Sequence, residues 1–396
     1  MPLTTQIKEF ALDLGYSKVG IIPADSFPEY IADLTKRHEM YSFYTKGPSR
    51  ALAGADPRSM MPSAKSIITT VYDYSQKNFP KELTDKIGRV YQARCYNAPP
   101  ERINGARPEL MRGFLRKLGC EVGDKISLPE RLVAAKAGIV TYGRNNFAYA
   151  DGIGSFIYLT SFVVDKELDY DSPTIEVGCP EGCSACMKAC PTQAIYEPLK
   201  LDPRRCIGFN TFMTQDRIAG SYIAPKIREK MGTHVHGCDI CQEVCPRNQA
   251  KLNEKLPDDE FLVKVAQDFS LAQMLNMTDE FYSTRIQPLM FNYIRDRKYF
   301  QRNAAIALGN LGDPANVPDL AVAMMDSEEL VRGYAAWALG KIGGASAKEI
   351  LEVSLGREAS DVVKEELRAA LSEVKKGHKT KGSRGVCDGN KLPNCL

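Results

Sequence analysis

The sequence has almost no net charge, no long apolar run and only four histidines. Lys and Arg number 52 and Asp and Glu 49, a formal net charge of +3, which excludes general affinity for polyanions and makes any nucleic-acid site a local patch. No apolar run approaches the roughly 18 residues of a membrane span. The stretch 1–21 contains Glu9 and Asp13 and lacks an apolar signal core, a twin arginine and a cleavage site, which predicts a cytoplasmic protein.

Cysteine is what the sequence has in excess. The chain of 396 residues is 44% hydrophobic and 26% charged, which predicts two or three folded domains and excludes collagen-like and disordered classes. Eight of its 12 cysteines lie between Cys179 and Cys245, in clusters flanked by proline. The chain is far longer than a disulfide scaffold, so this clustering indicates metal binding rather than disulfides.

The spacing of these cysteines favours two 4Fe-4S clusters. A Cys-x3-Cys-x2-Cys-x3-Cys-Pro run is followed by a single cysteine and then by Cys-x2-Cys-x3-Cys-Pro. In two-cluster ferredoxins the last cysteine of each run binds the other cluster. The expected ligand sets are Cys179, Cys183, Cys186 and Cys245 for one cluster, and Cys190, Cys206, Cys238 and Cys241 for the other. Two zinc sites or structural thiols are the alternatives, because Cys-x2-Cys also binds zinc.

The N-terminal region shows the alternating periodicity of an α/β core. Apolar spacing predicts helices and β-branched runs predict strands. Helices are expected at 5–15, around 30–44, at 108–118 and at 129–137, and strands at 18–22, 67–72 and 155–164. We expect this core to span 1–170, followed by a cysteine-rich module at 171–255.

The C-terminal region contains an internal repeat. The stretch from Asn303 to Gly312 recurs from Gly333 to Gly343, with a Leu-Gly ending each time and a second helix expected at 317–325. This pattern is typical of HEAT-like helical hairpins, which must pack on neighbours to bury their cores. We therefore expect a linker and helical domain over 256–374, docked on the rest, and a basic, disordered tail over 375–396.

Short motifs occur in a specific order along nearly the whole chain. They include Leu14-Gly15-Tyr16, Asp56-Pro57-Arg58, Glu130-Arg131, Gly143-Arg144-Asn145, Gly154-Ser155, Ala189-Cys190-Pro191-Thr192, Arg205-Cys206-Ile207, Gly237-Cys238-Asp239 and Arg302-Asn303-Ala304. In this order the chain resembles the epoxyqueuosine reductase family, cobalamin-dependent iron-sulfur enzymes related to reductive dehalogenases.

The resemblance implies an α+β multidomain fold. Its parts would be a nitroreductase-like α/β core that binds the corrinoid, a ferredoxin-like double 4Fe-4S module and C-terminal HEAT-like repeats. It implies removal of the epoxide oxygen of epoxyqueuosine in tRNA, with electrons from an external ferredoxin or flavodoxin passing through the clusters. The positions that would contact the corrinoid are Gly143, Asn145, Gly154 and Ser155.

The chain departs from the family at positions that would face the substrate. The family's proton donor lies in Asp-Thr-Ala-Pro-x-x-Glu-Arg, and only Asp124 and the final Glu-Arg match here. Where the family tends to have Arg-Asp-Tyr-His, this chain has Arg94-Cys95-Tyr96-Asn97. We expect Asp124 to donate a proton, with Tyr96 and Cys95 as alternates; a helix cap or turn is the alternative role of Asp124.

Three functions remain open from the sequence. The first is the tRNA reductase, for which Arg295, Arg297, Lys298 and Arg302, interleaved with Tyr293, Tyr299 and Phe300, would contact phosphates and bases, unless they form a solvated helix face. The second uses the same cofactors on a small organic substrate, as in reductive dehalogenation. The third is a non-catalytic electron-transfer protein.

Overall fold

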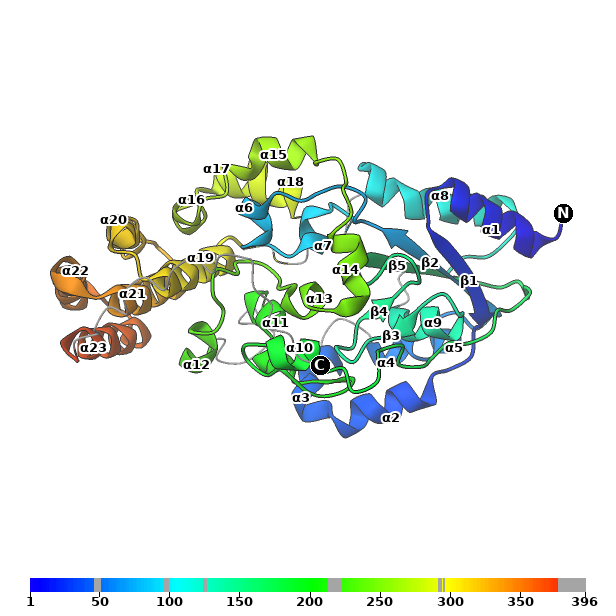
Figure 1. Ribbon diagram of the computed structural model, residues 1–396, viewed down its shortest axis with the longest axis horizontal. Coiled ribbons are helices and arrows are strands. Elements are labelled where there is room, and N and C mark those ends of the chain that lie inside the picture. The colour runs from blue at the N-terminus through cyan, green and yellow to red at the C-terminus, as the bar shows by residue number, and fades with distance from the viewer. Residues whose placement is uncertain are drawn as a thin grey trace, which may run out of the picture.

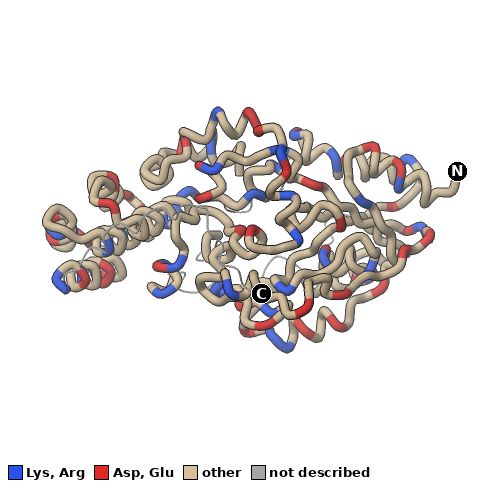
Figure 2. The backbone as a smooth tube through the Cα atoms, viewed as in Figure 1, with Lys and Arg blue, Asp and Glu red and all other residues tan. Residues whose placement is uncertain are grey.

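The computed structural model describes residues 1–45, 51–95, 100–123, 127–212, 223–290, 294 and 296–376. In Figure 1 the chain runs from an N-terminal core (blue and cyan), through a module of short elements (green), to a row of helices (yellow to red) at the opposite end. Lys and Arg are interleaved with Asp and Glu along the coloured part of the tube in Figure 2.

The core is a three-stranded antiparallel sheet with helices on both faces. Its strand order is β1 (Lys18–Pro23), β2 (Ser66–Asp73) and β5 (Ile157–Val164), so β2 is central. Ile68 of β2 pairs with Ile21 of β1 and with Phe162 of β5. The central strand is buried along almost its whole length, which explains its run of β-branched residues.

Two helices cover one face of this sheet and a third covers the other. Helix α1 (Leu3–Asp13) and helix α8 (Ile103–Lys117) share a core with Ile21, Ile68 and Phe162. Helix α9 (Glu130–Lys136) packs against β5 from the opposite face, where Val133 joins Ile67 and Val163. The remaining core elements are α2 (Pro28–Lys36), α3 (His38–Thr45), α4 (Ala51–Gly54), α5 (Pro57–Met60), α6 (Lys81–Thr84), α7 (Arg89–Gln92), β3 (Thr141–Tyr142) and β4 (Ala148–Tyr149).

The core elements expected from periodicity are present, with shifted ends. The expected helix at 108–118 begins earlier, at Ile103, so Pro108 lies inside α8. The single helix expected around 30–44 is two helices, α2 and α3, because Arg37 leaves the helical backbone conformation between them.

The middle of the chain is built from short elements, as its weak periodicity predicts. They are α10 (Ala185–Ala189), β6 (Ile195–Glu197), β7 (Lys200–Leu201), η1 (Pro203–Arg205), α11 (Ile207–Thr211), α12 (Pro225–Arg228), α13 (Ile240–Glu243) and α14 (Pro246–Leu252). We call residues 179–252 the cluster module.

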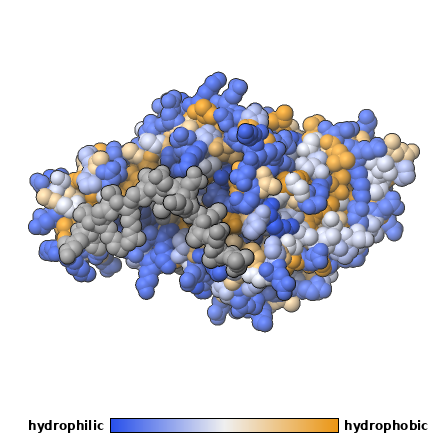
Figure 3. All heavy atoms as spheres, in the orientation of Figure 1, coloured by the Kyte–Doolittle hydropathy of each residue, from blue (hydrophilic) through white to orange (hydrophobic). Residues whose placement is uncertain are grey.

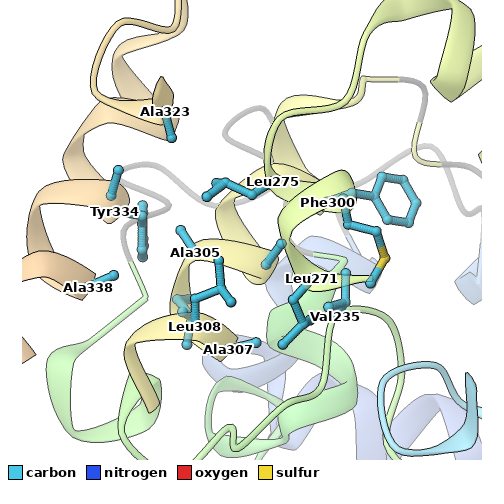
Figure 4. Packing of buried hydrophobic residues seen from close by; sticks show 14 of the residues in the cluster. Val235, Leu271, Leu275, Phe300, Ala305, Ala307, Leu308, Ala323, Tyr334 and Ala338 are labelled. Atoms are coloured by element: carbon cyan, nitrogen blue, oxygen red, sulfur yellow. The ribbon is translucent and has the colours of Figure 1, made fainter. Parts of the chain in front are cut away.

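The C-terminal region is helical and packs on the cluster module. Its elements are α15 (Glu260–Ala266), α16 (Leu271–Leu275), α17 (Asp279–Phe281), η2 (Tyr282–Ile286), α18 (Gln287–Leu289), α19 (Lys298–Leu311), η3 (Pro314–Asn316), α20 (Val317–Ala323), α21 (Glu329–Ile342), α22 (Gly344–Arg357) and α23 (Asp361–Lys375). One apolar core continues from Val235 of the module into α19 and α21 (Figure 4).

The repeated glycines let neighbouring helices approach closely. A Cβ at Gly309 of α19 would lie 2.9 Å from the Cα of Ala338 on α21, and one at Gly340 would lie 2.7 Å from the Cα of Ala370 on α23. Both distances are too short for a real side-chain contact, so the Leu-Gly ending is a packing requirement.

Buried polar side chains join the repeats to the module. Arg302 and Asn303 of α19 are fully buried and donate to the carbonyls of Asn210 and Thr211, at 2.9 Å and 2.6 Å. Arg228 of α12 forms an ion pair with Glu366 of α23 at 2.6 Å. These bonds satisfy polar groups at the joint, the contact between the repeats and the cluster module. The repeats are therefore docked on the rest of the chain, as expected for so few repeat units.

No helix in the described part of the chain is long and apolar enough to cross a membrane. Hydrophilic residues cover most of the face seen in Figure 3, with the apolar residues in separate patches.

Candidate metal centre and adjoining cavity

Four thiols from distant positions come together at one end of α10 and α14. Cys186 lies in α10, and Cys245 immediately precedes α14. Burial, and then the neighbouring thiols of Cys245, Cys179 and Cys183, raise the pKa of Cys186. These are the four cysteines that ferredoxin-like spacing assigns to one cluster.

The other four thiols form a second group beside the first. Burial raises the pKa of Cys206, and the Cys190 thiol adds to the effect. Burial likewise raises the pKa of Cys241, with smaller contributions from Cys206 and Cys238 and from Cys186 of the first group. The structure therefore brings together both sets of four that the spacing predicts, and places the sets next to each other.

The chemistry of these two groups fits a metal cluster. Thiols buried together resist ionisation, but a coordinating metal deprotonates them outright. Backbone amides already point at two sulfurs: Arg144 N–H donates to Cys179 Sγ at 3.3 Å and Ala194 N–H to Cys190 Sγ at 3.2 Å. Sulfur atoms of a bound cluster would accept the same kind of backbone hydrogen bond.

No group of three His, Cys, Asp or Glu side chains within the described residues is arranged to hold a single metal ion. A four-iron cluster spans its thiolates with its own iron and sulfide atoms, so its ligands stand farther apart than those of one ion.

The loop 143–155 of the core is inserted against the cluster module. Asn145 is buried and donates to the Cys241 carbonyl at 3.1 Å, and Ser155 Oγ donates to Gln242 Oε1 at 2.9 Å. A Cβ at Gly154 would lie 2.3 Å from Asn248 Oδ1, and one at Gly143 2.4 Å from the Tyr149 ring. All four positions expected to contact a corrinoid are thus engaged with other protein groups.

A cavity of about 280 Å³ lies along the outer edge of β5. Helix α8 borders it on one side and the start of α9 on the other, so Arg107, Glu130 and Ser161 all line it. Its volume is just below the roughly 300–1,000 Å³ typical of small-molecule sites.

The cavity is lined by residues that flank the predicted proton donors in the sequence. Cys95 lines it, together with Pro100, Gly123 and Leu128. Asp124 and Tyr96 lie outside the described residues. Cys95 is buried, and burial raises its pKa to about 12, so its thiol stays protonated at neutral pH and is a weak nucleophile.

Glu130 is the cavity residue that sequence reasoning did not single out as functional. It was visible only as half of a Glu-Arg motif, and its position as the first residue of α9 suggests an ordinary helix start. In the structure it is partly buried, accepts a hydrogen bond from Ser161 Oγ, and has a pKa raised to about 7 by that burial.

The basic stretch near residue 300 is not a phosphate-binding surface, and that prediction is wrong for its described members. Tyr299, Phe300 and Arg302 are buried. Arg297 pairs with Asp279 at 2.7 Å and Lys298 with Glu328 at 3.2 Å. Tyr293 and Arg295 lie outside the described residues. Arg302 bonds carbonyl groups of the cluster module instead, whereas Arg297 and Lys298 pair with acidic side chains of the C-terminal helical region.

Comparison with known proteins identifies the module and the repeats. A family model described as a 4Fe-4S double cluster binding domain matches residues 179–248, and one described as HEAT repeats matches 288–372. Both the iron-sulfur interpretation of the cysteines and the helical repeats are thereby confirmed.

Full-length relatives share one name. Epoxyqueuosine reductase of Bacillus subtilis is 28% identical over 388 residues, spanning 96% of this chain and 98% of the relative. The Bacillus cereus protein of the same name is 29% identical, over 93% and 97% of the two chains. A crystal structure of epoxyqueuosine reductase with an epoxyqueuosine-modified tRNA-Tyr stem loop has a TM-score of 0.80 and 27% identity, over 94% of this chain and 99% of that one.

Proposed function

We propose that this chain, which belongs to the epoxyqueuosine reductase family, removes the epoxide oxygen of epoxyqueuosine in tRNA to give queuosine. The observation that supports this most directly is that one chain combines a pair of adjacent four-thiol groups with a cavity that contains proton-holding side chains. An electron-transfer protein would need the thiols but not the cavity.

The eight cysteines would be the ligands of two 4Fe-4S clusters that form an electron relay. Cys179, Cys183, Cys186 and Cys245 would hold one cluster, and Cys190, Cys206, Cys238 and Cys241 the other. Clusters transfer one electron at a time and reach potentials of about −700 mV, low enough for a difficult reduction. We propose an external ferredoxin or flavodoxin as donor and the cytoplasm as the place of reaction.

Asp124 would protonate the leaving oxygen, as the resemblance implies, with Tyr96 and Cys95 as alternates. The raised pKa of Cys95 favours a role as a neutral thiol at the cavity wall. Replacing Asp124 with Asn should abolish turnover while the iron content stays unchanged.

Cobalamin is a further cofactor that the resemblance implies. The contacts of Gly143, Asn145, Gly154 and Ser155 do not form an open cradle for it, because neighbouring protein groups fill the space beside each position. Contact through their backbone remains our proposal, and we derive no chemical step through this group. Cobalt and iron counts after anaerobic reconstitution with cobalamin test it: about eight irons with no cobalt would overturn it.

For the tRNA, helix α8 offers a basic surface that borders the cavity. Arg112 lines the cavity, and Arg116 and Lys117 are exposed one turn further on. The double variant R116A/K117A should weaken tRNA binding and lower the slope of log affinity against log salt by about one per lost phosphate contact. Lys348→Ala on α22, far along the repeats, is the control and should leave the slope unchanged.

The decisive experiment is anaerobic turnover of tRNA that carries epoxyqueuosine, with a low-potential reductant. Mass spectrometry of the digested nucleosides should show queuosine, one oxygen lighter than the substrate. Cys206→Ala is the matched variant that removes one proposed ligand and should give no product. Absence of product with fully loaded protein, together with reductive dehalogenation of an aryl halide, would favour a small organic substrate instead.

A further inference from the structure

Glu130 and Ser161 face each other across the junction of α9 and β5. Glu130 is the first residue of α9 and directly follows Pro129. Ser161 Oγ donates to Glu130 Oε2, and the Ser161 backbone N–H also bonds this carboxyl group. The carboxyl group is therefore held in one place by two donors from the edge strand.

Both residues also line the cavity, so a molecule bound in the cavity could reach the pair. The titratable and charged groups that share the cavity are Arg107, Glu109 and Arg112 of α8, Tyr158 of β5, Tyr72 of β2, Tyr16 and Cys95. Within the described residues no salt bridge joins Glu130 to a cation. Arg112 pairs with Glu109, and Arg107 stacks on the Tyr72 ring at 4.1 Å.

The charge state of the carboxyl group follows from these surroundings. Burial raises the pKa of Glu130 to about 7, and the two hydrogen bonds from Ser161 act in the opposite direction. A carboxylic acid with this pKa holds a proton near neutral pH and can release it, which is the property a general acid needs.

The proposed reduction needs two protons. Converting an epoxide to an alkene breaks both carbon–oxygen bonds, forms one carbon–carbon π bond, and takes up two electrons and two protons as the oxygen leaves as water. The clusters supply the electrons from the external donor one at a time. Asp124 would account for one proton and leaves the source of the second unassigned.

We infer that Glu130, held by Ser161, is a second proton donor of this site and delivers its proton to the departing oxygen. The inference rests on the proposed function for the identity of the acceptor. The geometry of the pair stands without it: a carboxyl group, two fixed donors and an opening to the cavity.

The first test needs no turnover. Infrared difference spectra of the iron-loaded chain, recorded below and above about pH 7, should show a protonated-carboxyl band that disappears as the pH rises. The band should be absent from Glu130→Gln and present in Glu260→Gln, the control at the same first position of another seven-residue helix, α15. A band that persists in Glu130→Gln overturns the inference whatever the protein's substrate.

The second test uses turnover. Glu130→Gln should lower kcat by about 100-fold, within the range for loss of a general acid, with KM and iron content unchanged. Ser161→Ala removes one donor to the carboxylate, so the pH at which kcat falls should move upward. Unchanged kcat in Glu130→Gln, with normal turnover by the parent chain, overturns the proton role. If the parent chain itself fails, the proposed function fails and the infrared test still decides the protonation of Glu130.

Discussion

The cluster module and the helical repeats are stabilised by different means, although they share an interface. Helix α19 of the repeats buries eleven of its fourteen residues, from Tyr299 to Gly309. Helix α13 of the module buries only Gln242 and is four residues long. Apolar packing is sufficient to define α19, whereas α13 has so little of it that the neighbouring thiols and their metal must define the chain path there. The cluster module should therefore be sensitive to loss of a metal ligand, and the repeats to changes in side-chain packing.

The largest effect should come from removing one thiol. Cys241→Ala removes one of the four thiolate ligands of one cluster. We therefore expect at most about four irons per chain and loss of turnover. The measurement is an iron assay with EPR on anaerobically purified protein. Cys120→Ala, a buried thiol of the N-terminal core, is the control and should keep all its iron. Full iron in Cys241→Ala would remove Cys241 from the ligand set.

The next effect should come from the buried ion pair at the joint. Arg228→Ala leaves Glu366 without its cation and the Ile223 carbonyl without a donor. Loss of one partner of such a pair costs about 3–5 kcal/mol, so the free energy of unfolding should fall by about that amount. The exposed pair of Lys348 and Glu352 gives the control, since Lys348→Ala should change stability by less than about 0.5 kcal/mol. Equal effects would mean that the joint contributes no more than a surface contact.

A smaller effect separates packing from helix propensity within the repeats. Gly340→Ala places a methyl group against Ala370 and should destabilise the chain by about 1–3 kcal/mol. Gly356→Ala in α22, where a Cβ meets nothing within 4 Å, should be neutral or stabilising by up to about 1 kcal/mol. Chemical denaturation followed by circular dichroism measures both. Destabilisation by both variants would refute the close approach of α21 and α23.

The smallest effect concerns Glu130, which lies in the N-terminal core and in neither of the two regions compared above. The folded pKa of Glu130 is raised from 4.5 to about 7, so its contribution to stability is fully present below about pH 4.5 and is lost as the pH rises through about 7. Glu130→Gln removes this dependence. The difference between the thermal midpoint of the variant and that of the parent chain should become about 2 °C more positive from acidic to alkaline buffer. A difference that does not change with pH would contradict the raised pKa.

The sequence was informative where the signal was local. Spacing between Cys179 and Cys245 was enough to predict a double cluster, because each of the two cysteine runs that end in Cys-Pro is a short-range pattern. The repeat from Asn303 predicted the helices, because helical periodicity and the Leu-Gly ending are both short-range patterns.

The sequence was misleading or silent where distant segments meet. Arg302 reads as a solvent-facing base, but its partners are carbonyls of Asn210 and Thr211, which no local pattern connects to it. The cavity was not foreseeable because α8, β5 and the start of α9 each supply only part of its wall. Glu130 acquires its raised pKa from burial at that junction, a property of the assembled fold.

The order of the cysteines along the chain has a consequence for how the protein matures. Helix α10 is followed within one turn by a thiol of the other group, and α13 joins Cys241 of one group to Cys245 of the other. The polypeptide thus crosses between the two thiol groups at each of these short helices. Neither thiol group can therefore assume its final geometry while the other group lacks its cluster. We expect iron insertion to be all-or-none, so that chains with a single cluster are short-lived and a half-loaded enzyme does not accumulate in the cell.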